Sequence, residues 1–452
     1  MSSPVFDLGI RAGRLLTMKG GLGEVMENGF VGILGDRIAE VSAWEARHQK
    51  SCREFLDLSG QIVMPGLVNA HTHLPMSLFR GFEDDVPFHE WLFKRIFPVE
   101  AELVDAGFVQ TGAELSALEC IRFGTTTVNE MYFHAPVSAE VLDRAGLRGW
   151  VAWPFMDFPL PDEKHLGADA LPSRERRFLD FFERYKNHPR VRPSLGPHAP
   201  YTCSDEVLLQ VKRLSGSCGV PIHMHVAETA QEVQDSIERH GKTPVRRLYD
   251  LGLLSPRFFA AHCVHFSEED LRLFAKTGAS VLYNPDSNLK LGSGVAPVPA
   301  YRKAGSPVGI GSDGPASNND LSLFGAMDLG TKVQKLTSRD NTAMVALDAL
   351  NLATLEGARA LGLGNETGSI EPGKKADVIG IRTDYPHMQP LNSVLSQLVY
   401  SCQGLEVDTV IGDGRLLLRN GKFQTLDEAA VFQKADLIRS VLKDYLAQHQ
   451  IR

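Results

Sequence analysis

VRPSLGPHAPYTCSDEVLLQVKRLSGSCGVPIHMHVAE, residues 191–228, contains one complete copy of the unit from which we predict the fold. Two short apolar runs, at 191–200 and 221–228, each end in polar residues. The segment 204–217 between them has the spacing of an amphipathic helix. An apolar run, a helix and a second apolar run predict two parallel strands joined by a crossover helix.

The same rhythm recurs through the middle of the chain, where we count eight such runs. They lie at residues 62–73, 124–131, 149–156, 191–200, 221–228, 258–265, 280–288 and 307–315. Eight repeats predict an α/β protein whose sheet closes into a (β/α)₈ TIM-type barrel. An open doubly wound sheet would show the same alternation and stays as the alternative. No Gly-rich phosphate-binding motif follows any of the runs, so the sequence offers no obvious cradle for nucleotide phosphates.

The two ends of the chain have a different texture. They hold short β-like pieces with glycine turns, including a Gly-Asp-Gly hairpin signal at 412–414. We therefore expect a small β-sandwich assembled from both ends. The expected boundaries are 1–64 and 369–425 for the sandwich, 65–368 for the barrel and 426–452 for a C-terminal helix.

Composition limits the kinds of binding partner and the cellular compartment that we expect for this protein. The chain of 452 residues is 43% hydrophobic and 23% charged, with a net charge of −8, as in ordinary globular proteins with a large core. No run of five or more Lys or Arg occurs, which argues against nucleic-acid binding. Six scattered cysteines indicate free thiols in a reducing compartment. We find no signal peptide and no membrane-spanning stretch of about 18 apolar residues, so we expect a cytoplasmic protein. Homo-oligomer formation stays open.

Polar residues collect where the apolar runs end, which in a barrel is the catalytic edge. They are His71 and His73, His225 and Glu228, His262, and Asp313. Two histidines two positions apart on a strand point the same way. Three imidazoles and a carboxylate at one barrel mouth form a mixed N/O set suited to Zn²⁺ or Fe²⁺. A divalent ion there lowers the pKa of its water to about 7, which favours a hydrolase.

Each of these residues also has a structural interpretation. The His71/His73 pair is compatible with hydrogen-bonded core histidines, and His262 with a satisfied core histidine. Asp313 is compatible with a helix cap beside glycines. We interpret His223, one step deeper than His225, as a core residue.

Several longer motifs resemble the amidohydrolase superfamily and, more narrowly, the 5-methylthioadenosine/S-adenosylhomocysteine deaminases. The resemblance spans residues from about 60 to 425. Its motifs are PGLVNAHTHLPMSLFRG, HVAET, AAHCVH, YNPDSNLKLGSG, GSDGPASNN and GSIEPGKKADVIGI. It implies a hydrolytic deaminase that converts 5′-methylthioadenosine, S-adenosylhomocysteine or adenosine to the inosine derivative and ammonia.

The resemblance also implies the roles of individual residues. One divalent ion, Zn²⁺ with Fe²⁺ or Mn²⁺ as alternatives, is held by His71, His73, His225 and Asp313. A second ion in this superfamily normally needs a lysine at the end of the fourth strand. That run ends in His198-Ala-Pro, so we expect one ion.

Catalytic and substrate-binding roles follow from the same resemblance. Asp313 also acts as the base, Glu228 carries a proton to the ring and His262 steadies the attacking water. His198 and Glu100 contact the substrate, with Glu100 receiving the ribose hydroxyls. Trp91 is expected to line the pocket, with core packing as the alternative.

S-adenosylhomocysteine as substrate would need a cation to bind its carboxylate, and one segment does not supply an arginine for this. No arginine lies between Arg148 and Arg174, and Trp153, Phe155 and Phe158 predict an apolar wall. Lys164 or His165 would be weaker substitutes for arginine, and a cation from another loop is the alternative. We therefore predict methylthioadenosine or adenosine as substrate.

Two other functions compete with this one. A guanine, cytosine or triazine hydrolase would share the metal set but have no ribose for Glu100 to bind. A barrel that has lost catalysis is disfavoured because every candidate ligand and Glu228 are present.

Overall fold

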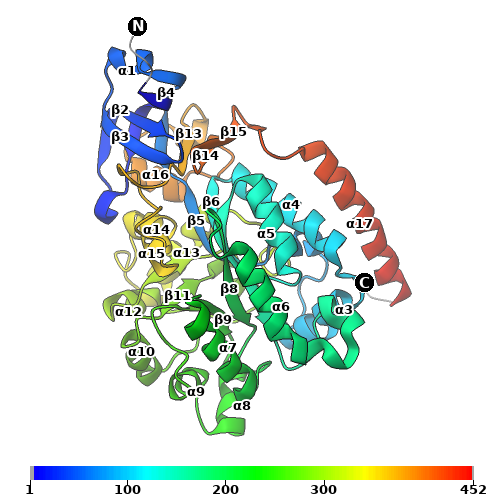
Figure 1. Cartoon of the computed structure of the whole chain (residues 1–452). Coiled ribbons are helices and arrows are strands. Elements are labelled where there is room, and N and C mark those ends of the chain that lie inside the picture. The colour runs from blue at the N-terminus through cyan, green and yellow to red at the C-terminus, as the bar shows by residue number, and fades with distance from the viewer. Residues whose placement is uncertain (1–4, 450–452) are drawn as a thin grey trace.

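The computed structural model describes residues 5–449, which form two eight-stranded sheets (Figure 1). In one of them the strands follow chain order, and each is parallel to the next. These strands are β5 (Leu67–Thr72), β6 (Thr125–Met131), β7 (Arg148–Phe155), β8 (Val191–Pro197), β9 (Ile222–Val226), β10 (Phe258–His262), β11 (Ser280–Tyr283) and β12 (Val308–Ile310). The backbone N–H of Asp313, just past β12, donates to the carbonyl oxygen of His71 in β5 (3.0 Å). This bond joins the first and last strands, so the predicted barrel is confirmed and the open sheet is excluded.

Helices connect successive strands and cover the barrel. They are α4 (Ala106–Arg122), α5 (Ala135–Ala145), α6 (Ala170–Tyr185), α7 (Asp205–Cys218), α8 (Ala230–His240), α9 (Pro244–Asp250), α10 (Glu268–Ala275), α11 (Pro285–Lys290) and α12 (Val298–Lys303), followed after β12 by α13 (Leu323–Ser338), α14 (Ala346–Leu352) and α15 (Leu355–Ala360). Helix α7 shows why they form. Ser204 caps its first turn, Gly219 ends it at φ 70°, and Leu208, Val211 and Leu214 form its buried stripe.

The other sheet, which we call the accessory sheet, is built from both chain ends. Its strands run in the order β16 (Lys422–Phe423), β15 (Arg415–Arg419), β14 (Val407–Gly412), β13 (Val378–Arg382), β4 (Cys52–Pro65), β1 (Phe6–Leu16), β2 (Val25–Leu34) and β3 (Arg37–Ala43). Antiparallel pairing of β13 with β4 joins the two ends. The predicted hairpin turns at Asp413 and Gly414, both with positive φ.

The first predicted run, 62–73, is divided between the two sheets. Its beginning belongs to β4, which ends at Pro65, and β5 starts at Leu67. Gly66 lies between them, where a Cβ atom would come within 2.2 Å of Thr126 Oγ1. The crossing therefore requires glycine, and the run is two strands rather than one.

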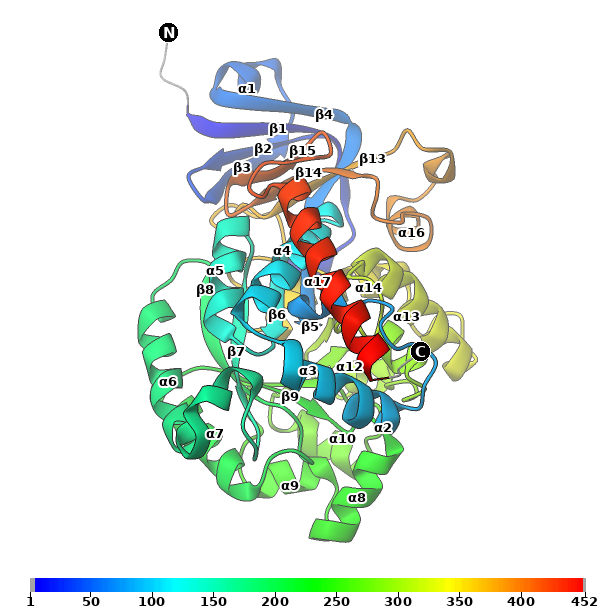
Figure 2. The same cartoon turned by 90° about the vertical axis from the view of Figure 1, so that its right-hand side faces the viewer.

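The last helix, α17 (Glu428–Gln448), lies against α4 on the outside of the barrel (Figure 2). It begins at Asp427, whose side chain accepts from the N–H of Ala430. The predicted end of this helix at 450–452 lies outside the described residues. All six cysteines are free. Between residues 5 and 449, no helix combines the length and the apolar character needed to span a bilayer.

Candidate active site

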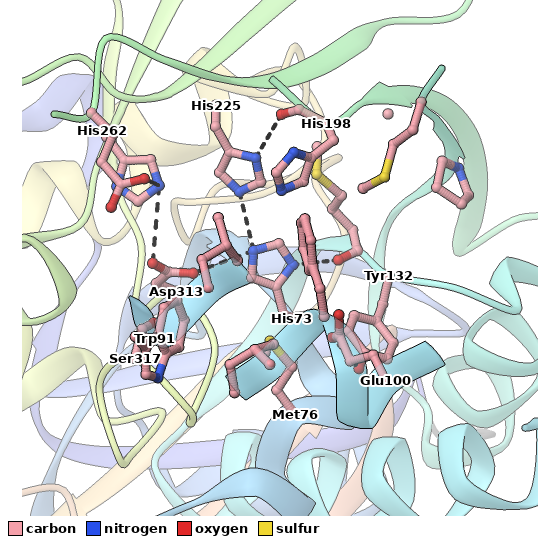
Figure 3. Close-up of a pocket in the computed structure, with 18 of the residues that line it drawn as sticks. His73, Met76, Trp91, Glu100, Tyr132, His198, His225, His262, Asp313 and Ser317 are labelled. Carbon is pink, nitrogen blue, oxygen red and sulfur yellow. Dashed lines mark hydrogen bonds and ion pairs between the residues drawn. The ribbon is translucent and has the colours of Figure 1, made fainter. Parts of the chain in front are cut away.

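The carboxyl ends of the strands bring the predicted ligands together, and Figure 3 shows three of them, His73, His225 and Asp313. The Nε2 atoms of His73 and His225 lie 3.2 Å apart. Asp313 Oδ1 lies 3.4 Å from His71 Nε2 and 3.3 Å from His73 Nε2. Strands β5, β9 and β10 and the turn after β12 thus bring together donor atoms from residues spread over positions 71 to 313. His71, His73 and His225 form one group, and His71, His262 and Asp313 form another, each with its donor atoms within 4.8 Å of one another.

Backbone carbonyls orient two of these imidazoles. His73 donates from Nδ1 to the carbonyl oxygen of Met131, and His225 donates from Nδ1 to that of His198 (2.7 Å). Each bond leaves Nε2 as a lone-pair donor facing the centre, as in metal-binding histidines generally. His71 Nδ1 lies 2.8 Å from Nε2 of His223, so His223 contacts a predicted ligand directly while remaining fully buried.

The donor set fits a divalent ion. Donors about 2.0–2.1 Å from a tetrahedral Zn²⁺ lie about 3.4 Å from one another, close to the 3.2 Å between His73 and His225 and to the 3.4 and 3.3 Å from Asp313 to His71 and His73. His71 Nε2 is buried, and no hydrogen-bond partner for it exists in the described part of the chain. Burial lowers the pKa of His71 to about 4 and holds that of His225 well below its usual range. The imidazoles are therefore neutral, the form that binds metal.

The backbone at these strand ends is strained. Ala227, His262 and Asp313 have φ values of 51°, 70° and 62°, in the left-handed region. Such a conformation costs about 1–3 kcal/mol for a non-glycine residue and is concentrated at functional sites. Here it turns the chain just where side chains must point into the barrel mouth.

Glu228 lies beside the cluster. Its Oε2 is 3.8 Å from His262 Nε2, and its Oε1 accepts a hydrogen bond from Ser293 Oγ (3.3 Å). Burial raises the pKa of Glu228, the charge of Asp313 raises it further, and His262 opposes both. A raised pKa brings a carboxyl group closer to the range in which it can act as a general acid.

His262 is oriented by a polar side chain rather than by the backbone. Its Nδ1 donates to Asn288 Oδ1 (2.8 Å), and its Nε2 lies 4.0 Å from Asp313 Oδ2. Its Nε2 therefore points toward the space between the two carboxylates.

A pocket of about 730 Å³ extends from this cluster. Its lining includes the four predicted substrate-binding residues, which are Glu100, His198, Glu228 and Trp91. Trp91 begins the helical turn η3 (Trp91–Ile96) and is 7% exposed. His198 Nδ1 lies 3.0 Å from Thr202 Oγ1.

Glu100, on α3 (Phe97–Leu103), lies on the opposite side of the pocket from His262 in Figure 3. Sequence reasoning missed its partner, Tyr132, whose hydroxyl donates to Glu100 Oε1 (2.6 Å). Burial raises the pKa of Glu100 to about 8, and the bond from Tyr132 opposes the rise. Tyr132 directly follows β6, so the rule that selected the other residues at strand ends also applies to it.

The apolar wall is present but consists of other residues than predicted. Trp153, Phe155 and Phe158 do not line the pocket; Pro154 and Met156 do, together with residues such as Phe97, Phe133 and Leu291. Along β7 side chains alternate between faces, so Pro154 points into the pocket and Trp153 packs outside against Phe181.

The predicted cation substitutes also lie elsewhere. Neither Lys164 nor His165 reaches the pocket, and His165 borders a separate cavity with His134 and Asp162. Within residues 5–449, the pocket lining contains no Lys or Arg.

The fold and the donor cluster define the class of metal-dependent hydrolases built on a (β/α)₈ barrel. Residues 62–417 match the model of the Amidohydrolase family, and the chain belongs to this family.

Similar proteins cover nearly the whole chain. It is 41% identical to the 5′-deoxyadenosine deaminase of Methanothermobacter thermautotrophicus, over 91% of this chain and 94% of the relative. It is 39% identical to the 5-methylthioadenosine/S-adenosylhomocysteine deaminase of Syntrophobacter fumaroxidans, over 98% of this chain and 100% of the relative. A solved structure, an adenosine deaminase from Xanthomonas campestris with bound zinc, superposes with a TM-score of 0.94 at 37% identity, over 98% of this chain and 100% of that one.

Proposed function

We propose that this protein hydrolyses the exocyclic C–N bond of an adenosine-type nucleoside, releasing ammonia and the inosine derivative. The observation that carries the proposal is a single pocket with a metal-type donor cluster at one end and the buried carboxyl group of Glu100 at the other. Glu228 lies beside the cluster, where an acid is needed. The names of the three similar proteins support it, because each acts on an adenosine-type nucleoside.

In this proposal His71, His73, His225 and Asp313 hold one divalent ion, and Zn²⁺ is the first candidate. The Xanthomonas structure with bound zinc supports that choice, and N/O ligation also accommodates Fe²⁺ or Mn²⁺. When bound, the ion lowers the pKa of a water molecule from about 15.7 to about 7 and so supplies the nucleophile.

The chain's own residues then move the protons. Asp313 accepts a proton from the water as its oxygen bonds to C6 of the purine, and Glu228 gives its proton to N1. His262 donates from Nε2 to the attacking oxygen. Asp313 passes its proton to the amino group, the C6–N bond breaks and ammonia leaves. Glu228 regains a proton from the new hydroxyl as the carbonyl forms, so both carboxyl groups return to their starting states.

Glu100 positions the nucleoside by accepting hydrogen bonds from the ribose hydroxyls. The apolar wall of Met156, Phe97 and Phe133 suits an uncharged 5′ substituent. Methylthioadenosine, 5′-deoxyadenosine or adenosine is therefore favoured over S-adenosylhomocysteine, whose amino-acid end needs a cation.

An ammonia-release assay over nucleosides and free bases tests the substrate class. We expect turnover of the nucleosides and little of guanine, cytosine or a triazine. Glu100→Ala should weaken kcat/KM for nucleosides without affecting any residual turnover of free bases. Efficient turnover of a free base, unaffected by Glu100→Ala, would replace the nucleoside assignment by the ring-hydrolase alternative.

Glu228→Gln tests the acid. General acid–base catalysis contributes about 10²–10⁴ in rate, so kcat should fall by that order while the metal content stays equal to wild type. Unchanged turnover in a metal-loaded variant would remove Glu228 from the mechanism.

A further inference from the structure

Two helices of the barrel, α8 after β9 and α10 after β10, begin with the same kind of sequence but use it differently. In α10, Ser267 caps the helix, and Asp270 bonds back to the N–H of Ser267 (3.1 Å), closing a capping box. In α8, Thr229 caps the helix by accepting from the N–H of Glu232 (3.1 Å). The carboxylate of Glu232, however, does not return to Thr229.

Glu232 reaches past its own cap into the turn before the helix. Its Oε1 accepts from the N–H of Ala227 and its Oε2 from the N–H of Glu228, both at 2.8 Å. Ala227 is the left-handed residue that turns the chain out of β9. The carboxylate thus holds two consecutive N–H groups of a strained turn, and it is buried, at 6% exposure.

We propose that Glu232 is a positioning residue for catalysis: it fixes the backbone from which Glu228 projects into the pocket. The proposal rests on the proton-carrying role proposed for Glu228. Capping alone does not explain the arrangement, because Thr229 already caps α8 and the two bonds of Glu232 go to residues outside the helix.

The same turn is held from its other side. The carbonyl oxygen of Ala227 accepts from the N–H groups of Val264 and His265, just after β10 (3.0 and 2.9 Å). His265 Nε2 in turn donates to the carbonyl oxygen of Ser293 (2.7 Å). Ser293 Oγ donates to the carboxylate of Glu228.

These bonds form a closed circuit that holds Glu228 at both ends. Glu232 fixes its backbone, and Ser293 contacts its carboxylate. The circuit also joins the end of β9 to the end of β10, which carries His262. The distance of 3.8 Å between Glu228 Oε2 and His262 Nε2 is therefore set by this circuit of hydrogen bonds as well as by the pairing of β9 with β10.

Glu232→Gln tests the inference with little change in shape. An amide offers one acceptor oxygen where the carboxylate offers two, so one of the two N–H groups loses its partner. A displacement of about 1 Å costs about 10²-fold in rate, so we expect kcat to fall about 10- to 100-fold. KM and bound metal should stay at wild-type values, because Glu232 touches neither the pocket nor the predicted ligands.

Asp270→Asn is the matched control. It alters a buried carboxylate at the corresponding position of α10, so it should lower the unfolding temperature and leave kcat unchanged. If Glu232→Gln does not give folded enzyme, Glu232→Asp carries the same test. Its side chain is one methylene shorter, cannot span both N–H groups and should show the same kcat-specific loss.

Combining the variants separates this inference from the proposed function. In a Glu228→Gln background, Glu232→Gln should lower kcat less than about twofold, because residues that act as one unit are not additive. An undiminished loss in that background, or an unchanged kcat for Glu232→Gln alone, would overturn the positioning role and leave the proposed function standing. An unchanged kcat for Glu228→Gln alone would instead overturn the role of Glu228 and, with it, that of Glu232.

Discussion

Arg148 at the amino-terminal end of the barrel and His71 at the carboxyl-terminal end are both almost completely buried, and their surroundings differ. Arg148 Nη2 lies 2.6 Å from Asp413 Oδ1, and its Nε lies 3.1 Å from Asp377 Oδ2. Lys375 also contacts Asp413, at 3.1 Å. Around His71 the nearest groups are mainly further imidazoles, and Nε2 has no hydrogen-bond partner among the described residues.

The comparison separates two uses of buried charge. At the amino-terminal end, basic and acidic groups from the barrel and the accessory sheet pair with one another, and they hold the two units together. At the carboxyl-terminal end, His71 Nε2 has no hydrogen-bond partner among the described residues, and in the proposed function a divalent cation would take that place. Charge at the first end therefore supports the fold, and charge at the second supports the chemistry.

Removing the metal should have the largest effect on activity. It should disrupt the site at the carboxyl-terminal end of the barrel and leave the ion pairs at the amino-terminal end intact. We expect a chelator to abolish turnover, because the nucleophile depends on the ion. Ammonia release should return on adding Zn²⁺, Fe²⁺ or Mn²⁺. The unfolding temperature should fall as well, since an ion that binds only the folded state stabilises it.

The control for this experiment is the far-ultraviolet circular dichroism of the chelated protein, which should match that of the loaded protein. Full turnover by protein that elemental analysis shows to be metal-free would contradict the claim that the cluster at the carboxyl-terminal end holds a catalytic metal.

Arg148→Met should disrupt the ion pairs at the amino-terminal end of the barrel. It should lower stability and, unlike removal of the metal, leave activity unchanged. It leaves Asp377 and Asp413 facing each other without the guanidinium, and breaking a buried ion pair costs about 3–5 kcal/mol. The free energy of unfolding in urea should fall by that amount, while kcat/KM of the folded fraction stays near wild type.

Arg184→Met provides the comparison, because the pair of Arg184 with Glu140 is 59% and 52% exposed. An exposed pair contributes about 0–1 kcal/mol. Equal losses of stability in the two variants would show that the Arg148 network does not hold the two units together.

Much of the barrel was predictable because its strands are buried on both faces. Such strands appear in the sequence as continuous apolar runs, and each of the eight runs overlaps a strand of the barrel. The division of 62–73 at Gly66 was not predictable in this way. An apolar run carries no mark of a change of sheet, and the need for glycine there arises from Thr126, 60 residues away in the chain.

The site was predictable where residues stand at strand ends and less so where a side chain acts through another. His71, His73, His225, Glu228, His262 and Asp313 all follow the strand-end rule. Tyr132 also stands at a strand end, but its contact with Glu100 depends on a three-dimensional neighbour. Glu232 stands on a helix and holds the turn before Glu228, so the strand-end rule does not reach it. The prediction of the wall residues was wrong for a simpler reason: Trp153 and Phe155 lie on the face of β7 opposite to Pro154, as strand alternation requires.

The smallest effect that we predict is a pH dependence of substrate binding that arises from Glu100, at the end of the pocket away from the donor cluster. Burial raises the pKa of Glu100 to about 8, so below that pH the free enzyme holds this carboxyl group mostly protonated. Ribose hydroxyls donate to the ionised form, and binding at lower pH must therefore release a proton. Affinity should rise with pH until the free carboxyl group ionises, and kcat/KM should rise by up to about tenfold per pH unit below pH 8.

Two variants assign this pH dependence to Glu100 rather than to the donor cluster. Glu100→Gln should remove the rise, because an amide does not titrate. Tyr132→Phe removes the hydrogen bond that favours the ionised form, so the midpoint should move to higher pH. If both variants kept the wild-type profile, the titrating group would have to be another one, and the pocket would lose its carboxylate receptor for ribose. The Arg148 network should contribute nothing to this profile, because the neighbouring carboxylates raise the pKa of its guanidinium far above this range.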